Sequence, residues 1–371
     1  MSLCLMLCPV CSAVVSGVCF LLLRLYISVL VNAFGFQELL QEFKNFMMAL
    51  KRVLVVNKSY PDAGLKLLKT KLEPTIIPYL DSDPESLPEI KKNISNGFDA
   101  LVWNTKHRLT GEILDLAGPR LKAVTTMASG IDHIDVDELV KRGLPLGNTL
   151  NVLDDAVADI TVGLVIGAAR RFKEGIKELE SGEWKFGVQW SLGQDIARST
   201  VGIVGLGGVG QAVVRRLKGF DVAKFIYSGR TDKPEAKALG AERVPLEQLL
   251  KESDFVILCC PLSEETKHLI NAKSLQIMKS TAVLVNIGRG GLIDQKALYD
   301  ALKEGQIFAA GLDVTTPEPL PKDDPLISLP NCFIMPHLGS ATVDTRNAMA
   351  CIAANNILLA LENKPMLNPV V

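Results

Sequence analysis

The sequence predicts an α/β protein made of two doubly wound domains, each a parallel sheet covered by helices on both faces. The chain has 371 residues, more than the ~100–200 residues of one ordinary domain. From Lys51 onward, short apolar runs alternate with amphipathic segments, as they do in successive βαβ units. A glycine-rich turn lies between a strand and a helix within residues 199–220, where a second series of such units begins.

The composition favours a folded protein with small-molecule ligands. Hydrophobic residues make up 48% of the chain and the formal net charge is −1, which argues against disorder. A nucleic-acid binder would need a strongly basic face, so no nucleic-acid partner is expected. No set of cysteines and histidines has the spacing of metal ligands, and no metal is expected.

Residues 1–50 form an apolar extension that differs from the rest of the chain. Met1 to Leu23 carry no charge, and Arg24 alone interrupts an apolar stretch that reaches Val31. That length suffices for an uncleaved membrane anchor through residues 1–31. Met47 and Met48 precede the first strand-like run, as a start codon would. The extension is therefore expected to be either an anchor or a dispensable addition.

The cysteines of the body indicate a reducing compartment. Cys259 is adjacent to Cys260 inside an apolar run, an arrangement that suits core thiols better than a disulfide framework. We expect a cytoplasmic protein, with membrane anchorage through residues 1–31 as the alternative.

The expected elements follow the chain in order. In the first series, strand-like and helical runs alternate over residues 52–57, 62–72, 100–104, 110–118 and 121–127. A long apolar helix is expected over 154–180 as a connector, with acidic residues at its start and basic ones later. In the second series, six strands are expected at 200–204, 224–230, 254–260, 282–290, 307–314 and 332–337.

These elements predict two domains with a discontinuous first one. A closing helix over 344–363 comes after the six expected strands of the second sheet, so we expect it to cross back. The substrate domain is expected to comprise 51–150 and 339–371, and the nucleotide-binding domain 151–338.

The glycine turn predicts a dinucleotide site. Gly205, Gly207 and Gly210 form G-x-G-x-x-G directly after one strand and directly before a helix. The first glycine permits a tight turn, the second lets the backbone approach a pyrophosphate, and the third lets helix and strand pack closely. The helix N-terminus, with Gly208 and Val209, supplies amide donors.

The end of the next strand indicates the form of the cofactor. Ser228 and Arg230 lie where an acidic residue would bind the ribose 2′-hydroxyl of NAD. A hydroxyl and a guanidinium suit a 2′-phosphate, so NADP(H) is the predicted cofactor. Asp232, close by, keeps NAD(H) as the alternative.

Three polar residues follow successive strands of the second series. Arg289 lies in a glycine-rich turn, Glu318 stands between two prolines, and His337 follows the last strand. Open α/β sheets bind ligands at the carboxyl ends of their strands, so the three are expected to meet. A planar guanidinium suits a substrate carboxylate or carbonyl. A carboxylate beside a histidine favours the imidazolium, which can protonate a carbonyl oxygen.

Five segments give the chain its resemblance to the D-isomer-specific 2-hydroxyacid dehydrogenases, from about Lys51 to the C-terminus. They are "STVGIVGLGGVGQAVVRRL", "VNIGRGGLID", "AAGLDVTTPEPLP", "MPHLGSAT" and "TTMASGIDHID". The resemblance implies that Arg289 orients a 2-oxo acid, that Glu318 supports a histidine, and that His337 is the acid/base.

The same resemblance extends the site. It assigns Ser129 and Gly130 to a loop whose backbone amides hold the substrate carboxylate, although an apolar residue is more usual where Ser129 stands. It assigns Asp313, in "AAGLDVTTPEPLP", to the cofactor site. Trp190 matches a tryptophan that reaches the partner's active site in dimers of the family; ordinary packing is the other interpretation.

The implied activity is NADPH-preferring reduction of glyoxylate to glycolate and of hydroxypyruvate to D-glycerate by a homodimer. Formate and phosphoglycerate dehydrogenases share the fold, but Glu318 and the lack of an acidic strand end in "YSGR" count against both. A nucleotide-sensing corepressor that binds partner proteins is the rival from another class. His107 and His133 are competing proton donors from the first domain, and His268 is a polar residue near a helix.

Overall fold

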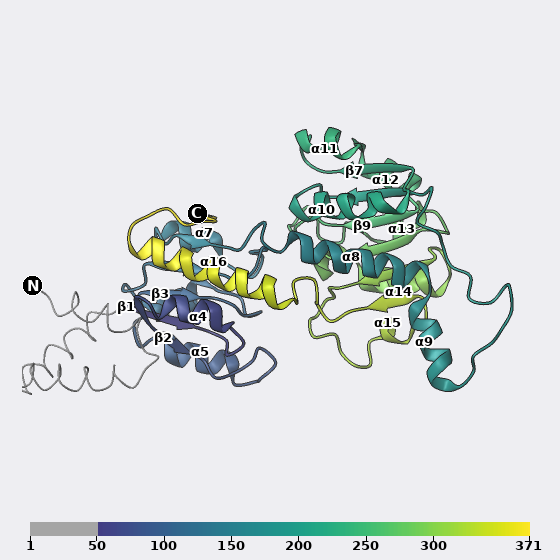
Figure 1. Cartoon of the computed structure of the whole chain (residues 1–371). Coiled ribbons are helices and arrows are strands. Elements are labelled where there is room, and N and C mark those ends of the chain that lie inside the picture. The colour runs from purple at the N-terminus through teal and green to yellow at the C-terminus, as the bar shows by residue number, and fades with distance from the viewer. Residues whose placement is uncertain (1–50) are drawn as a thin grey trace, which may run out of the picture.

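The structure is a computed structural model that describes residues 51–371. It contains two parallel sheets flanked by helices, which confirms the predicted α/β class with two doubly wound domains (Figure 1). The expected anchor or dispensable extension, residues 1–50, lies outside the described residues. Between residues 51 and 371, no helix combines the length and the apolar character that a bilayer crossing requires.

The first sheet has five parallel strands in the order β2-β1-β3-β4-β5. Its strands are β1 (Lys51–Val55), β2 (Leu72–Ile76), β3 (Ala100–Val102), β4 (Ala123–Thr125) and β5 (Leu146–Gly147). The helices between them are α4 (Asp62–Leu68), α5 (Ser86–Ile94), α6 (Gly111–Ala117) and α7 (Val136–Lys141).

Alternation along the strands separates two cores in this domain. Leu54 of β1 packs with Ile90 of α5 and Ile113 of α6 on one face of the sheet. Val53 and Val55 point to the opposite face, because successive side chains of a strand alternate. Burial on both faces explains why β1 reads as a nearly continuous apolar run.

The second sheet has seven parallel strands in the order β12-β11-β10-β9-β6-β7-β8. They are β6 (Thr200–Val204), β7 (Lys224–Ser228), β8 (Ala241–Arg243), β9 (Phe255–Leu258), β10 (Val283–Asn286), β11 (Ala309–Leu312) and β12 (Cys332–Ile334). The strand order reverses between β6 and β9, which places a crevice at the carboxyl ends of these two strands.

The seventh strand, β8, was not among the six expected. Of its residues only Ala241 is buried, whereas Glu242 and Arg243 are exposed. An edge strand paired on one side needs no apolar run. For that reason β8 has no strand pattern in the sequence.

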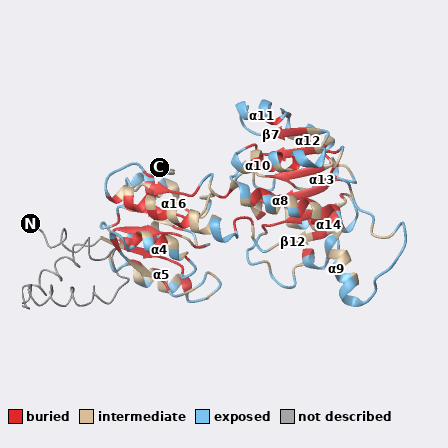
Figure 2. Ribbon diagram, in the orientation of Figure 1, coloured by how far each residue is buried: buried red, intermediate tan, exposed pale blue. Residues whose placement is uncertain are grey.

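Helices and short 3-10 turns cover both faces of the second sheet. They are α10 (Gly208–Leu217), α11 (Pro234–Leu239), α12 (Leu246–Glu252), α13 (Ala272–Gln276), α14 (Gln295–Lys303), α15 (Pro325–Ser328), η1 (Lys218–Phe220) and η2 (Gly290–Leu292). Figure 2 shows the strands as a buried layer and the outer helix faces as exposed.

The expected continuous helix over 154–180 is two helices, α8 (Asp154–Ala169) and α9 (Phe172–Ser181), so that prediction is wrong. Arg171 between them has left-handed backbone with φ 56°. The carbonyl of Ala169 accepts a hydrogen bond from the N–H of Gln194 at 2.9 Å, in place of a bond within a continuing helix. The side chain of Arg171 pairs with Glu174 in the first turn of α9.

The last helix, α16 (Val343–Leu361), lies against the first sheet. Its residues Ala350, Ala354, Ile357 and Leu361 share a core with Val53 and with Leu65 of α4. In Figure 1 this yellow helix runs beside the purple α4, far from the strands that precede it in sequence. The chain thus passes between the two sheets twice, before α8 and before α16.

Candidate active site

Arg289, Glu318 and His337 follow three neighbouring strands of the second sheet. Arg289 comes after β10, Glu318 after β11 and His337 after β12, and these strands are parallel neighbours. Parallel strands end at the same edge of a sheet, so their following loops share one rim. The structure therefore brings the three predicted residues to one side of the sheet.

His337 and Glu318 are in direct contact. The Nδ1 atom of His337 lies 2.8 Å from Oε2 of Glu318, and Oε1 of Glu318 accepts the N–H of Thr315 at 3.1 Å. His337 has left-handed backbone with φ 56°, and its N–H donates to the carbonyl of Asp313 at 2.9 Å. Backbone and carboxylate together orient the ring, which leaves Nε2 as the nitrogen available to a substrate.

The surroundings of Glu318 keep its carboxylate ionised. Partial burial acts to raise its pKa, but the hydrogen bond and charge of His337, the N–H of Thr315 and the charge of Arg289 outweigh burial, so the pKa is lowered. The side chains of His337 and Glu318 remain 47% and 38% exposed, so both are open to the cleft. An ionised carboxylate at this position can stabilise a positively charged imidazole.

Arg289 connects the two domains. Its Nε donates to Oδ1 of Asp132 at 2.9 Å, and Nη1 donates to the carbonyl of Gly288 at 2.9 Å. A Cβ atom built on Gly130 would lie 2.0 Å from Nη2 of Arg289, so the guanidinium packs directly on the backbone of the predicted substrate loop. Only glycine leaves room for this contact.

Two buried asparagines hold the predicted substrate loop by hydrogen bonds. The amide of Asn148 donates to the carbonyl of Ser129 at 2.9 Å, and the carbonyl of Asn148 accepts from the fully buried Asn356 of α16 at 3.0 Å. The carbonyl of Ser129 is thereby tied to the domain interior. The backbone of Gly130 lies beside the guanidinium of Arg289, and binding of a carboxylate by this loop stays a prediction.

The pair His337 and Glu318 opens into a cavity of about 1000 Å³ between the domains. From the first domain, Asn57, Asp81 and Lys106 line the same cavity. Asp81 accepts from the amide of Asn57 at 2.9 Å and from the N–H of Lys106 at 2.8 Å, which joins two loops. The cleft therefore has walls from both sheets.

Sequence reasoning missed these first-domain residues and Asp132. Asn57 follows β1 and Lys106 follows β3, so the strand-end rule applied to the first sheet would have found them. Asp132 lies two positions after Gly130 in "GIDH", and no pattern in the sequence connects it to Arg289. Their contact depends on how the two domains dock.

The glycine turn has the backbone geometry that the motif requires. Gly205 has φ 97°, and a Cβ atom there would lie 2.9 Å from the backbone of Cys260. A Cβ atom on Gly210 would lie 2.3 Å from the carbonyl oxygen of Gly205. On Gly207 it would meet no atom of the described residues within 4 Å, so the outer side of the turn is open. Gly208 and Val209 begin α10 beside this open side.

Ser228 and Arg230 lie at the end of β7, next to the glycine turn. The N–H of Gly205 donates to the carbonyl of Ser228 at 2.8 Å, which joins the two loops. Arg230 is exposed. Arg243 of β8 donates to the carbonyls of Gly229 and Arg230 in this loop, and it was not among the predicted residues.

Asp313 is buried, and both of its carboxylate oxygens are engaged. One accepts the N–H of Leu338 at 2.7 Å and the other the N–H of Gly339 at 2.8 Å. These bonds hold the backbone just after His337. The structure thus places Asp313 beneath the histidine loop, and its contact with a cofactor stays a prediction.

Trp190 lies in the loop after α9 and is not among the residues that line the cavity, although Ile176 and Glu180 of α9 are. Its Nε1 donates to Oε2 of Glu178 in α9 at 2.9 Å. The structure places Trp190 with α9 and does not bring it to His337 of the same chain. Its predicted approach to a partner's site stays a prediction.

The competing histidines lie away from the Glu318 carboxylate. Nε2 of His133 is 3.3 Å from the hydroxyl of Thr126, and burial lowers the pKa of His133. Burial also lowers the pKa of His107, whose Nε2 has no partner among the described residues. His268 has left-handed backbone and donates its N–H to the carbonyl of Gly291.

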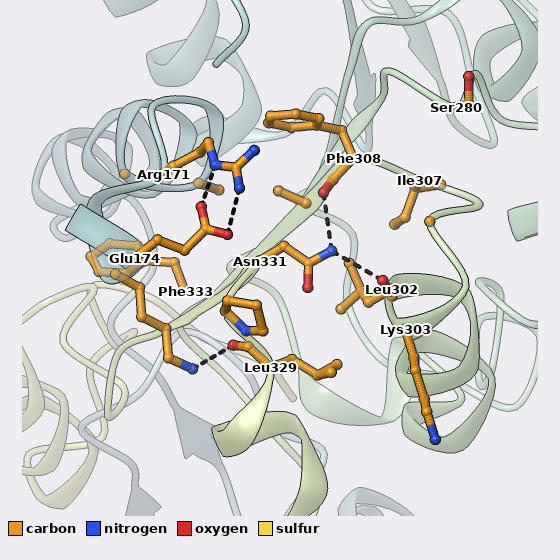
Figure 3. Close-up of a pocket in the computed structure, with 16 residues that line it drawn as sticks. Arg171, Glu174, Ser280, Leu302, Lys303, Ile307, Phe308, Leu329, Asn331 and Phe333 are labelled. Carbon is orange, nitrogen blue, oxygen red and sulfur yellow. Dashed lines mark hydrogen bonds and ion pairs between the residues drawn. The ribbon is translucent and has the colours of Figure 1, made fainter. Parts of the chain in front are cut away.

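A second cavity, of about 360 Å³, lies near the amino ends of β11 and β12 (Figure 3). Arg171 pairs there with Glu174, and the amide of Asn331 donates to the carbonyls of Leu302 and Phe308. Lys173, also in its wall, donates to the carbonyls of Ile327, Leu329 and Cys332. It lies at the sheet edge opposite His337, and no group in it resembles a catalytic pair.

Comparison with known proteins agrees with this geometry. Residues 162–339 match the model of the D-isomer specific 2-hydroxyacid dehydrogenase, NAD binding domain. Glyoxylate reductase/hydroxypyruvate reductase of Mus musculus is 43% identical over 308 residues, which cover 82% of this chain and 94% of that protein. Glyoxylate reductase of Thermococcus onnurineus is 44% identical over 320 residues, with 85% and 94% covered.

A solved structure gives the same result. NADPH-dependent glyoxylate/hydroxypyruvate reductase from Sinorhizobium meliloti, in complex with NADP and malonate, superposes with a TM-score of 0.73 at 30% identity, covering 87% of this chain and 97% of that one. The two sequence relatives exceed 40% identity over more than four fifths of the chain. The chain therefore belongs to the D-isomer-specific 2-hydroxyacid dehydrogenase family.

Proposed function

We propose that the protein is an NADPH-preferring reductase that converts glyoxylate to glycolate and hydroxypyruvate to D-glycerate. The observation that carries the proposal is the 2.8 Å contact between His337 and Glu318 on the same sheet edge as Arg289. An acid/base, its supporting carboxylate and a guanidinium are the groups that reduction of a 2-oxo acid requires. The names of the relatives from mouse and Thermococcus support the choice of substrates.

The substrate is bound by Arg289 and by the loop at Ser129 and Gly130. Backbone N–H groups of the loop hold the carboxylate, and the guanidinium bonds the carboxylate and the 2-oxo group. Asp132 accepts a hydrogen bond from Nε of Arg289 at 2.9 Å, so the guanidinium is already oriented before a substrate binds. This preorganisation lowers the cost of binding.

His337 performs the proton transfer. The nicotinamide cofactor, when bound, supplies the hydride that C2 of the substrate accepts. Nε2 of His337 gives a proton to the carbonyl oxygen, and the ionised Glu318 stabilises the ring while it is positively charged. Arg289 stabilises the negative charge that develops on the same oxygen.

The glycine turn suits a dinucleotide. The open side of Gly207 leaves room for a pyrophosphate close to the backbone, and the first turn of α10 offers its N–H groups there. Ser228 and the exposed Arg230 at the end of β7 favour the 2′-phosphate of NADP(H). NAD(H) is the second cofactor in this proposal.

The protein acts as a homodimer through α9 and the loop that follows it. The loop extends away from the second domain in Figure 1. Together with α9 it carries exposed apolar side chains. Leu179 is 62% exposed, Phe186 86% and Val188 93%. Such a patch is costly in water, and a second copy of the chain would cover it and bring Trp190 to the partner's site.

A kinetic assay tests the proposal. Oxidation of NADPH and of NADH is followed by absorbance with glyoxylate, hydroxypyruvate and pyruvate as substrates. Turnover with the first two, at higher kcat/KM with NADPH, is the expected result. Absence of turnover with all three would favour a nucleotide-sensing protein of the corepressor type. Sedimentation of wild type and of a Phe186→Ser, Val188→Ser variant tests the dimer.

The same assay applies to the N-terminal extension. We propose a cytoplasmic enzyme whose activity does not depend on residues 1–47, in line with the unpaired thiols of Cys259 and Cys260. The full chain and a chain that starts at Met48 are expected to have equal activity. Membrane association of the full chain alone would instead identify the extension as an anchor.

A further inference from the structure

Arg243 holds the turn that follows β7. It lies on the edge strand β8, opposite Tyr227 in the parallel register. Its Nη2 donates to the carbonyls of Gly229 at 2.9 Å and Arg230 at 3.2 Å, and Nη1 donates to Oδ1 of Asp232 at 3.1 Å. One guanidinium therefore contacts three of the four residues from Gly229 to Asp232.

The other end of this turn is fixed as well. The hydroxyl of Tyr227, whose side chain is buried, accepts the N–H of Lys233 at 3.0 Å. Between these anchors lie Ser228 and Arg230, the residues proposed for the 2′-phosphate. The position of both depends on the turn that Arg243 and Tyr227 shape.

Asp232 is the residue of this turn whose negative charge would repel the 2′-phosphate of a bound cofactor. A carboxylate near the ribose 2′ position binds a 2′-hydroxyl and repels a 2′-phosphate. In the structure its charge is paired with Arg243. The side chain of Asp232 is otherwise 83% exposed and has no other ion-pair partner among the described residues. Loss of Arg243 would leave this carboxylate unpaired in the cofactor loop.

We propose that Arg243 is a positioning residue for cofactor discrimination: it holds the loop of Ser228 and Arg230 in shape and neutralises Asp232. The inference rests on the proposed preference for NADPH. It deepens that proposal, because Arg243 comes from a different strand and need not touch the cofactor.

A purely structural role predicts a different result. Exposed ion pairs contribute little to stability. Replacement of an ordinary surface arginine would therefore leave the ratio of kcat/KM for NADPH to that for NADH unchanged. Lys224 provides a matched control, since it forms exposed ion pairs with Glu242 and Glu252 at the opposite end of β7. Lys224→Ala is expected to leave the ratio of kcat/KM for NADPH to that for NADH unchanged.

The test measures this ratio with glyoxylate for wild type, Arg243→Ala, Asp232→Asn and the double variant. Arg243→Ala is expected to lower the ratio ~10-fold, mainly through a higher KM for NADPH, while kcat at saturating NADPH stays within ~2-fold. Asp232→Asn is expected to raise the ratio ~3-fold in the Arg243→Ala background and to change it little in wild type.

Three outcomes would overturn the inference: an unchanged ratio in Arg243→Ala, an equal loss with both cofactors, or an Asp232→Asn effect of the same size in both backgrounds. The wild-type ratio tests the proposed NADPH preference separately. A wild type that prefers NADH would overturn that preference, whereas the change from wild type to variant still reports on Arg243.

Discussion

His337 and Glu318 form a hydrogen bond of 2.8 Å between the loops that follow two adjacent strands, β12 and β11. The bond uses Nδ1 and so determines which ring nitrogen faces the cleft. It also couples the proton on the histidine to a carboxylate that stays ionised. The first two predictions separate these contributions.

Replacement of His337 by Ala is expected to lower kcat with glyoxylate by ~10²- to 10⁴-fold, the usual contribution of a general acid. NADPH should bind with nearly unchanged affinity, because the histidine loop lies at β12 and the glycine turn at β6. Steady-state kinetics and fluorescence titration of NADPH measure the two quantities. Retained turnover would show that His337 is not the acid/base and has only a structural role.

Replacement of Glu318 by Gln keeps the size of the side chain and removes its charge. We expect kcat to fall ~10- to 100-fold with a small change in KM, because support for the charged ring is lost. Since the pKa of Glu318 is lowered on folding, its ionisation stabilises the fold above about pH 4.5, and this is lost as the pH falls further. The melting temperatures of wild type and variant should converge as the pH falls through the lowered pKa of Glu318 in the folded protein.

Asp132 should act on the substrate through Arg289. Arg289→Ala is expected to raise KM and to lower kcat/KM by ~10²-fold or more. Asp132→Asn keeps a weaker acceptor for Nε, so a smaller rise in KM, ~3- to 10-fold, is expected with little change in kcat. Kinetics with hydroxypyruvate measure both. Equal effects of the two substitutions would contradict a supporting role for Asp132.

The strand-end residues were predictable because a polar residue in a loop directly after an apolar run is visible in the sequence. Each apolar run before Arg289, Glu318 and His337 ends in a loop, and parallel strands place these loops on one edge. The contact between His337 and Glu318 was also expected, but its backbone geometry was not. It depends on a left-handed backbone at His337, a conformation that a non-glycine residue rarely adopts and that no local pattern indicates.

Contacts across domains and edges were not predictable. Asp132 contacts Arg289 only because the two domains pack against each other. No hydrophobic periodicity in either segment indicates how the domains pack. Arg243 lies on a strand too short and too exposed to have an apolar pattern. The break between α8 and α9 was not predicted because both segments have the composition of a helix. The break lies at Arg171, whose backbone is left-handed.

The glycine turn offers a test that separates folding from cofactor binding. Gly210→Ala places a methyl group 2.3 Å from the carbonyl oxygen of Gly205, which is backbone and cannot move aside cheaply. We expect a loss of about 1–3 kcal/mol in the free energy of unfolding. Gly207→Ala meets no described atom within 4 Å and should unfold like wild type.

The same two variants should differ in their affinity for NADPH. The methyl group of Gly207→Ala points to the open side where the pyrophosphate is proposed to lie, so binding should weaken ~10-fold or more. Urea unfolding and fluorescence titration measure the two effects. Unchanged NADPH affinity in Gly207→Ala would place the pyrophosphate elsewhere.

Asp154 is expected to weaken cofactor binding as the pH rises. Its Oδ2 lies 1.9 Å from where a Cβ atom on Gly208 would stand, so a carboxylate abuts the phosphate-binding turn. Burial and then the neighbouring Asp155 raise the pKa of Asp154, against the charge of Arg215. A raised pKa on folding means that its contribution to stability is present at low pH and is lost as the pH rises through the folded pKa.

Asp154→Asn should therefore bind NADPH ~3- to 10-fold more tightly than wild type at pH 8, because it removes a negative charge near the pyrophosphate. The advantage should shrink as the pH falls through the raised pKa of Asp154, where the wild-type carboxylate takes up its proton. Asp155→Asn is the matched control: Asp155 pairs with Arg215 and Arg216 on the surface and is 68% exposed. If both variants bound NADPH equally, Asp154 would have no specific effect on the turn.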